Sequence, residues 1–143
     1  LPPSSAASDV YKRQPLTNTK GTTNALVSLV DIYPTLVEIC KLEPPKNQLD
    51  GESLVRIFNN LDSKGKEHVF IKRKNGFTLK TRQYSYTEFI NAKNNKTIDK
   101  MLYDHRSDKT ENRNVAEKEE FANIVLELSN ILHSKFKENI QGK

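Results

Sequence analysis

The last part of the chain carries the clearest hydrophobic pattern. Its apolar residues recur at intervals of three or four, and they are Phe121, Ile124, Val125, Leu128, Ile131, Leu132 and Phe136. This spacing places them along one side of an α-helix. Glu117, Glu119 and Glu120 fall in the first turns, where acidic side chains favour the positive end of the helix dipole. The pattern predicts a long C-terminal helix with one buried face.

The middle of the chain predicts strands. Val69, Phe70 and Ile71 are β-forming residues, and Asn75-Gly76 is a strong signal for a hairpin turn. Residues 77–81 and 84–90 alternate between apolar and polar positions, and after a polar loop at 91–96, residues 98–103 indicate one more strand. We therefore expect a small antiparallel sheet of three to four strands packed with the long C-terminal helix. This is the α+β fold class.

One or two helices are expected before the sheet. The apolar residues from Leu26 to Cys40 follow helical spacing, with Ser28 and Asp31 placed as a capping box. Pro34 has no backbone N–H, so it belongs in the early part of this helix or kinks it. The helix should end near Lys41, before two successive prolines. Residues 54–58 suit a second, short helix.

The first residues differ from the rest of the chain. The six residues Asp9 to Gln14 (DVYKRQ) resemble the translation of the transposon end used to tag DNA fragments for sequencing. We therefore interpret residues 1–14 as an adapter-derived tail, and we expect it to be disordered because of its Pro, Ser and Ala content. The N-terminus lacks the charged-then-apolar pattern of a signal peptide.

The composition limits the classes of protein to which this chain can belong. Hydrophobic residues make up 35% and charged residues 29% of the 143 positions, and no apolar run approaches the ~20 residues of a membrane-spanning helix. The net charge of +5 is spread along the chain, and its densest basic run is 72–74, with Lys80 and Arg82 nearby. Nucleic-acid binding would require a longer basic stripe interleaved with aromatic residues. A solvated strand and turn is one interpretation of this run, and recognition of a polyanion is the other.

Residues that carry chemistry are few. Cys40 is the single cysteine, so an intrachain disulfide and a multi-cysteine zinc site are excluded, and its apolar helical surroundings predict burial. His105 stands between acidic residues and is best explained as part of a polar turn. His68 and His133 have no partner that spacing can suggest, and we expect His133 at the surface. Nucleophile-elbow, phosphate-loop and dinucleotide-binding motifs are absent from the sequence.

Four stretches together resemble the C-terminal part of the sulfatase family. The first two, residues 27–36 (VSLVDIYPTL) and 49–54 (LDGESL), are similar to family motifs V-S-L-V-D-L-Y-P-T-L and L-D-G-x-S-L. The third, residues 76–81 with 84–89, resembles the strand pair of iduronate-2-sulfatase-like members. The fourth comprises residues 102–108, 111–112 and 114–116, and it resembles E-L-Y-D-H-x-x-D-P-x-E-x-x-N-L-A. The order and spacing of the four motifs make the resemblance specific.

The resemblance implies the chemistry of a longer parent protein. Sulfatases hydrolyse sulfate esters with a formylglycine made in a C/S-x-P/A-x-R motif and with a calcium ion that stabilises charge. These groups belong to the N-terminal half of the family, and Cys40 is followed by KLEP, which does not match the motif. We therefore assign no catalytic residue, no metal ligand and no cofactor to this chain. The fragment is expected to be inactive and the parent to be a sulfuric ester hydrolase.

The resemblance also implies an architecture and partners. Residues 15–60 would be the end of the catalytic domain and 61–143 the C-terminal subdomain of an alkaline-phosphatase-like sulfatase fold. The missing N-terminal catalytic domain would be the partner, a sulfated sugar or polysaccharide the substrate, and the periplasm or the exterior the location. Nucleic acid and membrane are not expected partners. Lys80, Arg82 and His105 are the candidates for facing an anionic substrate, with ordinary surface positions as the alternative.

Two other functions stay open. The chain could be a non-catalytic binding module for acidic polysaccharide, or an interaction subunit that uses an apolar face. Without a catalytic half, the helix around Tyr33 and Val37 should expose apolar surface. We then expect poor solubility or dimerisation.

Overall fold

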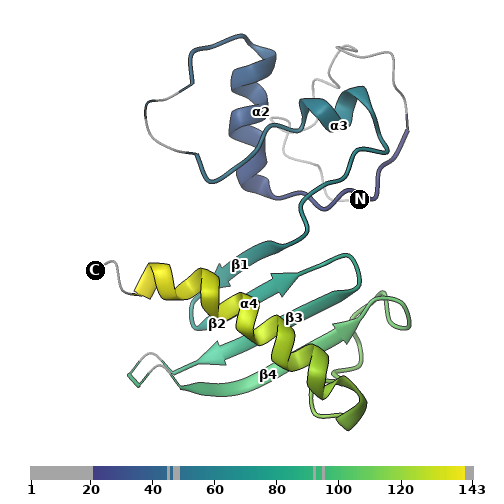
Figure 1. Cartoon of the computed structure of the whole chain (residues 1–143), viewed down its shortest axis with the longest axis vertical. Coiled ribbons are helices and arrows are strands. Elements are labelled where there is room, and N and C mark those ends of the chain that lie inside the picture. The colour runs from purple at the N-terminus through teal and green to yellow at the C-terminus, as the bar shows by residue number, and fades with distance from the viewer. Residues whose placement is uncertain (1–20, 45, 47–48, 92, 95, 141–143) are drawn as a thin grey trace, which may run out of the picture. The chain divides into compact units, whose positions relative to one another are not determined.

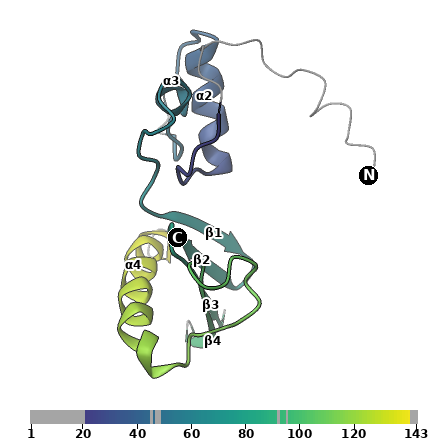
Figure 2. The same cartoon turned by 90° about the vertical axis from the view of Figure 1, so that its right-hand side faces the viewer.

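The computed structural model describes residues 21–44, 46, 49–91, 93–94 and 96–140, the last four by their backbone alone. The chain divides into two compact units, with the boundary between Gly65 and Lys66 (Figures 1 and 2). This boundary lies a few residues beyond the one expected at 60/61. The proposed adapter at residues 1–14 lies outside the described residues.

In unit 1, which ends at Gly65, the regular elements of the described residues are helices. Its elements are a 3₁₀ turn η1 (Leu29–Asp31) that continues into α2 (Ile32–Ile39), and a short helix α3 (Val55–Asn59). The predicted capping box is present, because a carboxylate oxygen of Asp31 accepts the Ser28 backbone N–H at 2.8 Å. Pro34 lies in the first turn of α2, where its missing N–H costs no helical hydrogen bond. Both predicted helices are confirmed.

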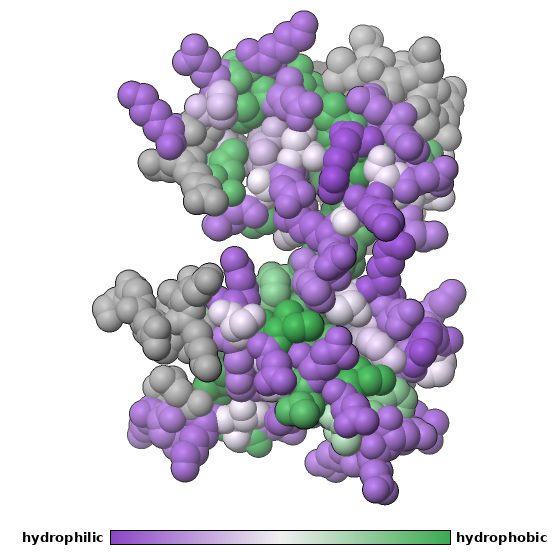
Figure 3. All heavy atoms as spheres, viewed as in Figure 1, coloured by the Kyte–Doolittle hydropathy of each residue, from purple (hydrophilic) through white to green (hydrophobic). Residues whose placement is uncertain are grey.

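The exposure of α2 was only partly predicted. Tyr33 is exposed as expected, but Val37 is buried, and Cys40 is exposed instead of packed in a core. Leu29 and Leu36 are exposed as well. The reason is that α3 and its neighbouring segments are too short to surround α2, so one side of the helix is covered and the other is not. Hydrophobic side chains accordingly reach the surface of this unit among hydrophilic ones (Figure 3).

Unit 2, from Lys66 onward, contains one antiparallel sheet. Its strands are β1 (Val69–Arg73), β2 (Gly76–Lys80), β3 (Tyr84–Ile90) and β4 (Thr97–Asp104), in the order β1-β2-β3-β4. The predicted hairpin is present, but Lys74 and Asn75 join β1 to β2, one residue earlier than the expected Asn75-Gly76, and Gly76 begins β2 opposite Arg73. A register irregularity at Phe89/Ile90 shifts the pairing of β3 with β4. All the expected strands are present.

One face of the sheet is covered by a helix. A 3₁₀ turn η2 (Glu119–Phe121) leads into α4 (Ala122–Ile140), which lies across the sheet (Figure 2). The core between them combines inward side chains of both layers, and its buried members are Phe77, Leu79, Tyr86, Leu102, Val115, Val125, Leu128, Leu132 and Phe136. The predicted α+β class is confirmed, with the predicted helical stripe as half of its core.

Within the described residues, no helix combines the length and the apolar character that crossing a bilayer requires.

Candidate functional site

Two of the three predicted substrate-facing residues meet on one carboxylate. Lys80 lies at the end of β2, and His105 directly follows β4. Oε1 of Glu111 lies 2.7 Å from Nε2 of His105 and 3.4 Å from Nζ of Lys80. The His105 backbone N–H also donates to the carbonyl of Gln83 at 2.8 Å, which ties the residue to the turn between β2 and β3. We call Lys80, His105 and Glu111 the β2–β4 end cluster.

Glu111 organises this cluster electrostatically. Burial alone would raise the pKa of its carboxyl, but the hydrogen bond from His105 and the nearby charge of Lys80 outweigh burial, so the pKa lies below its usual range. Glu111 is therefore ionised at neutral pH and compensates part of the positive charge of Lys80. It sits at a positive φ of 56°, a backbone conformation uncommon for a residue with a side chain.

The cluster retains hydrogen-bonding capacity toward a ligand. The Lys80 side chain is 41% exposed, and an ammonium group has three donors, only some of which Glu111 can accept. The His105 side chain is less exposed, at 17%. An anionic oxygen approaching this end of the sheet would meet an ammonium group already oriented by Glu111. The arrangement can bind an anion but contains no nucleophile.

Arg82 lies apart from the cluster. It is exposed in the turn between β2 and β3, and within the described part of the chain it forms no hydrogen bond or ion pair. The structure thus joins Lys80 and His105 through Glu111 and leaves the third candidate on the adjoining turn. Sequence reasoning gave Glu111 no role, and no spacing rule connects it to Lys80, thirty-one residues away.

The turn after β4 is fixed by a neighbouring ion pair. Nη2 of Arg106 lies 2.7 Å from Oδ2 of the buried Asp104, and it donates to the hydroxyl of Tyr84 at 2.6 Å. The hydrogen bonds from Arg106 hold the pKa of Asp104 below its usual range despite partial desolvation. The turn at residues 104–108 is therefore a rigid polar turn, as expected, and it positions His105 for its contact with Glu111.

The second polar cluster is centred on a fully buried carboxylate, Glu88 of β3. One oxygen, Oε1, accepts the hydroxyls of Tyr86 and Ser129, each at 2.6 Å. The other, Oε2, accepts the Thr97 hydroxyl at 3.0 Å and lies 2.8 Å from Nε2 of His133. Because its partners belong to β3, β4 and α4, Glu88 joins the sheet to the helix.

These hydrogen bonds and burial set the protonation of Glu88 and Tyr86. Burial raises the pKa of Glu88, but the donors from Ser129, Tyr86 and His133 together outweigh it, so the pKa is lowered. Burial and the adjacent carboxylate raise the pKa of the Tyr86 hydroxyl well above its usual value. Glu88 is thus an ionised, fully hydrogen-bonded group inside unit 2.

Sequence analysis missed the role of Glu88, although a signal existed. Glu88 follows Tyr84 and Tyr86 at alternate positions of the strand, so its side chain lies on the same, inward face as theirs. Such a residue needs several donors. His133 was expected at the surface, and its side chain is 44% exposed, but its ring nitrogen is engaged by Glu88. Only the packing of α4 on the sheet identifies this partner.

The described residues do not fit the calcium ion that the sulfatase resemblance implies. No three His, Cys, Asp or Glu side chains among them converge as metal ligands. The carboxylates at the centres of the two polar clusters are already used, Glu111 by Lys80 and His105 and Glu88 by four donors. We derive no step of the chemistry through calcium at these residues.

The sequence matches the family described as N-sulphoglucosamine sulphohydrolase, C-terminal, over residues 10–138. No curated protein sequence matches the chain.

Several solved structures share the fold. The protein BT4656, solved in complex with its substrate D-glucosamine-2-N,6-O-disulfate, is 19% identical, with a TM-score of 0.62 over 79% of this chain and 24% of that one. A putative sulfatase from Bacteroides thetaiotaomicron is 21% identical, with a TM-score of 0.60 over 76% and 24%. The phosphonate monoester hydrolase of Agrobacterium radiobacter is 22% identical, with a TM-score of 0.60 over 77% and 25%. The chain thus spans about a quarter of the length of these proteins.

Proposed function

Because this chain belongs to the N-sulphoglucosamine sulphohydrolase C-terminal family, we propose that it is the C-terminal part of a sulfatase that hydrolyses sulfate esters of a sulfated sugar or polysaccharide. The observation that carries the proposal is the family match, which extends over residues 10–138 and so includes both units. The four sequence motifs lie within this range. The resemblance of the third motif, residues 76–81 with 84–89, to iduronate-2-sulfatase-like members supports that subgroup.

The chain by itself should be catalytically inactive. A sulfatase needs a nucleophile that attacks sulfur and a cation that stabilises charge on the sulfuryl oxygens, and the formylglycine and calcium would belong to the preceding part of a longer protein. The exposed Cys40 lacks the modification motif. The preceding catalytic domain would be the principal partner of this chain, and the parent would be periplasmic or secreted.

The β2–β4 end cluster gives this chain a role in substrate recognition. Lys80 and Arg82 supply positive charge at one end of the sheet, and His105 is held beside Lys80 by Glu111. A sulfated sugar presents anionic oxygens that such side chains can contact. The proposed role is binding: these side chains would contact a sulfate group of the substrate and would not act as the nucleophile.

Extending the reading frame upstream in the source DNA tests this proposal. The extended frame should contain a C/S-x-P/A-x-R motif, and the extended protein should release sulfate from D-glucosamine-2-N,6-O-disulfate in the presence of calcium. The 143-residue chain alone should release none. The fold is shared with a phosphonate monoester hydrolase, so a phosphonate monoester serves as the comparison substrate. A native frame without the motif, or an extended protein that prefers the phosphonate, would contradict the proposal.

Within the extended protein, Lys80→Gln and Arg82→Gln should raise KM for the disulfated sugar with little change in kcat. This pattern is expected because the residues bind substrate and do not take part in bond breaking. Lys109→Gln, an exposed lysine outside the cluster, is the matched control. Equal kinetics for all three variants would remove the substrate-binding role.

A further inference from the structure

Unit 2 concentrates exposed positive charge at the end of the sheet opposite the β2–β4 end cluster. The β1–β2 hairpin contributes Lys72, Arg73 and Lys74, and the loop between β3 and β4 contributes Lys93 and Lys96. All five side chains are exposed. We call these five residues the hairpin-end basic surface. Both connections lie at the same end of the sheet in Figure 1.

The backbone holds the two connections together. The Ile90 N–H at the end of β3 donates to the Asn75 carbonyl of the hairpin at 2.8 Å, and the Asn91 N–H donates to the Lys96 carbonyl at 2.8 Å. The strand order places β1 three strand spacings from β4, and one spacing is about 4.8 Å, so the basic residues extend over roughly 14 Å. The cations are therefore spread along this end of the sheet and do not converge on one point, with Lys72 on the face that α4 covers and Arg73 and Lys74 directed away from α4.

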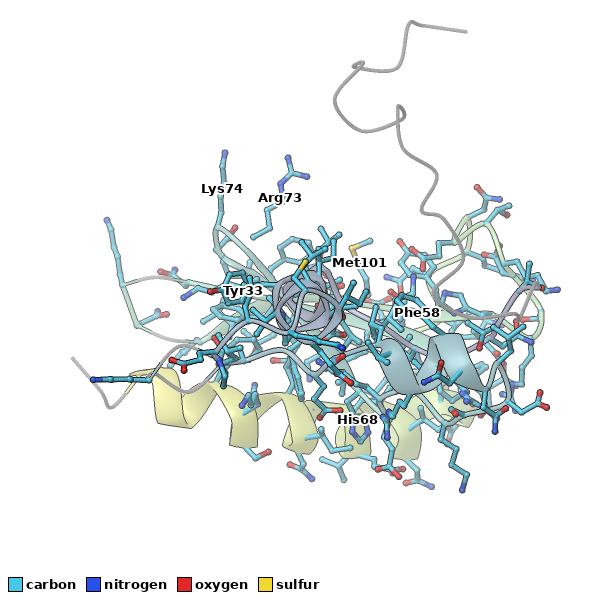
Figure 4. All side chains as sticks on the ribbon, turned by 90° about the horizontal axis from the view of Figure 1, so that it is seen from above. Tyr33, Phe58, His68, Arg73, Lys74 and Met101 are labelled. Carbon is cyan, nitrogen blue, oxygen red and sulfur yellow. The ribbon has the colours of Figure 1, made fainter. Side chains whose placement is uncertain are left out.

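The charges of this surface are not neutralised by the described residues. Arg73 and Lys74 form no ion pair there, and in Figure 4 they project side by side away from α4. The environment of Lys72 differs from that of Arg73 and Lys74, because its ammonium lies 5.3 Å from the centre of the Phe77 ring. The cations remain available to an external anion, whereas Lys80 at the opposite end pairs with Glu111.

Separate cations spread in this way suit a chain of regularly spaced anions. A single exposed ion pair contributes little, so useful affinity requires several contacts made by one molecule. A nucleic acid could supply these charges, but proteins that bind single strands also stack bases on exposed aromatic side chains. The aromatic side chains beside this surface are Phe77, which is buried, and Phe89, which is half-buried and lies close to Gly76, so neither is an exposed stacking platform.

We propose that the hairpin-end basic surface binds linear sulfated polysaccharide through its sulfate groups. This inference goes beyond the hydrolytic function, because it requires neither a catalytic domain nor the β2–β4 end cluster. The surface would hold a polymeric chain through residues other than those assigned to substrate contact.

The test uses the 143-residue chain with heparin as the probe. The variant combines Arg73→Gln, Lys74→Gln and Lys96→Gln, and it leaves Lys72 in place because that side chain packs on Phe77. The matched control removes three exposed cations elsewhere in unit 2 through Lys109→Gln, Arg113→Gln and Lys118→Gln. Both variants carry the same net charge. Binding is measured by fluorescence anisotropy of labelled heparin as a function of salt, and folding by circular dichroism.

At low salt the hairpin variant should bind heparin about tenfold more weakly than the unmodified chain, with a shallower salt dependence, while the control loses at most about twofold. Fully desulfated heparin should not compete. Equal weakening by both variants would mean that net charge alone is responsible and would overturn the proposal. Tighter binding of single-stranded DNA than of heparin at the same salt, or undetectable heparin binding, would also overturn it. Any of these results would leave the sulfatase proposal untouched, because that proposal rests on hydrolysis by the extended protein.

If the triple variant unfolds, Lys74→Gln alone replaces it. A loss of about twofold to threefold in heparin affinity relative to Lys109→Gln is then expected. Identical affinities for these two single variants would overturn the proposal.

Discussion

The carboxylate of Asp31 and the backbone N–H of Glu52 form a 2.9 Å hydrogen bond across twenty-one positions of sequence. A second hydrogen bond joins the same two segments, in which the Leu54 N–H donates to the Thr35 hydroxyl at 2.9 Å. Asp31 and Thr35 belong to the first sulfatase-like motif, and Glu52 and Leu54 to the second. Asp31 is fully buried and also accepts the Ser28 N–H, so one side chain begins the helix and anchors the following segment. These bonds hold the two motif segments together in the fold.

Gly51 should not tolerate a side chain. A Cβ added there would overlap the backbone carbonyl of Val30, which cannot move without displacing η1. We expect Gly51→Ala to destabilise unit 1 by about 2 kcal/mol or more, while Asp50→Ala, next to it and exposed, changes stability by less than about 0.5 kcal/mol. Hydrogen exchange of the unit 1 amides measures both. Unchanged protection of the Glu52 and Leu54 amides in Gly51→Ala would contradict the expectation.

Replacing the buried carboxylate should weaken unit 2. In Glu88→Gln one acceptor oxygen becomes an NH₂ group, which would face two donors, either Tyr86 and Ser129 or Thr97 and His133. Leaving buried donors unpaired costs about 1–3 kcal/mol. Urea unfolding followed by circular dichroism provides the measurement, with Glu127→Gln on the exposed side of α4 as the control. Equal midpoints for the two variants would remove Glu88 as a stabilising centre.

The buried stripe of α4 offers a comparison within one helix. Leu132 is fully buried in the core, whereas Leu126 is 62% exposed on the same helix. We expect Leu132→Ala to lower the free energy of unfolding by about 2–5 kcal/mol and Leu126→Ala by less than about 0.5 kcal/mol. Thermal unfolding distinguishes them, since the helix propensities of the two variants are matched. Similar melting temperatures would mean that α4 does not pack as described.

Acid should destabilise unit 2. The pKa values of Glu88 and Glu111 lie below the usual glutamate value of 4.5 in the folded state. A carboxyl with a depressed folded pKa contributes stability above its unfolded pKa, and this contribution is lost as the pH falls from about 4.5 through the folded value. We therefore expect the melting temperature to fall below about pH 4.5, and less steeply in Glu88→Gln than in the unmodified chain. Parallel pH profiles for the two proteins would be inconsistent with the lowered pKa of Glu88.

The exposed side of η1 and α2 should promote self-association of the isolated chain. Leu29, Tyr33 and Leu36 follow helical spacing and are 83%, 54% and 53% exposed. A contiguous apolar stripe of this kind is uncommon on a monomeric protein. Light scattering should show dimers or larger species at micromolar concentration, which the triple change of these residues to Ser shifts toward monomer. A monodisperse monomer in the unmodified chain would contradict this prediction.

The sequence by itself determined the elements and the family. The stripe from Phe121 to Phe136, the alternation of residues 84–90 and the Asn75-Gly76 turn each depend on local periodicity or backbone preference, which neighbouring residues already express. The helix and strands occur where these patterns placed them. The order and spacing of the four motifs likewise need no coordinates.

Only the tertiary structure decided which side chains meet. Val37 is buried and Tyr33 exposed because α3 covers one side of α2 and not the other. His133 reaches Glu88 across forty-five positions because α4 lies over β3, and Lys80 and His105 share Glu111 because the chain after β4 returns to the end of β2. Such pairings depend on the packing of distant segments, in which hydrogen bonds and burial select one arrangement. Residue spacing along the chain carries no record of that choice.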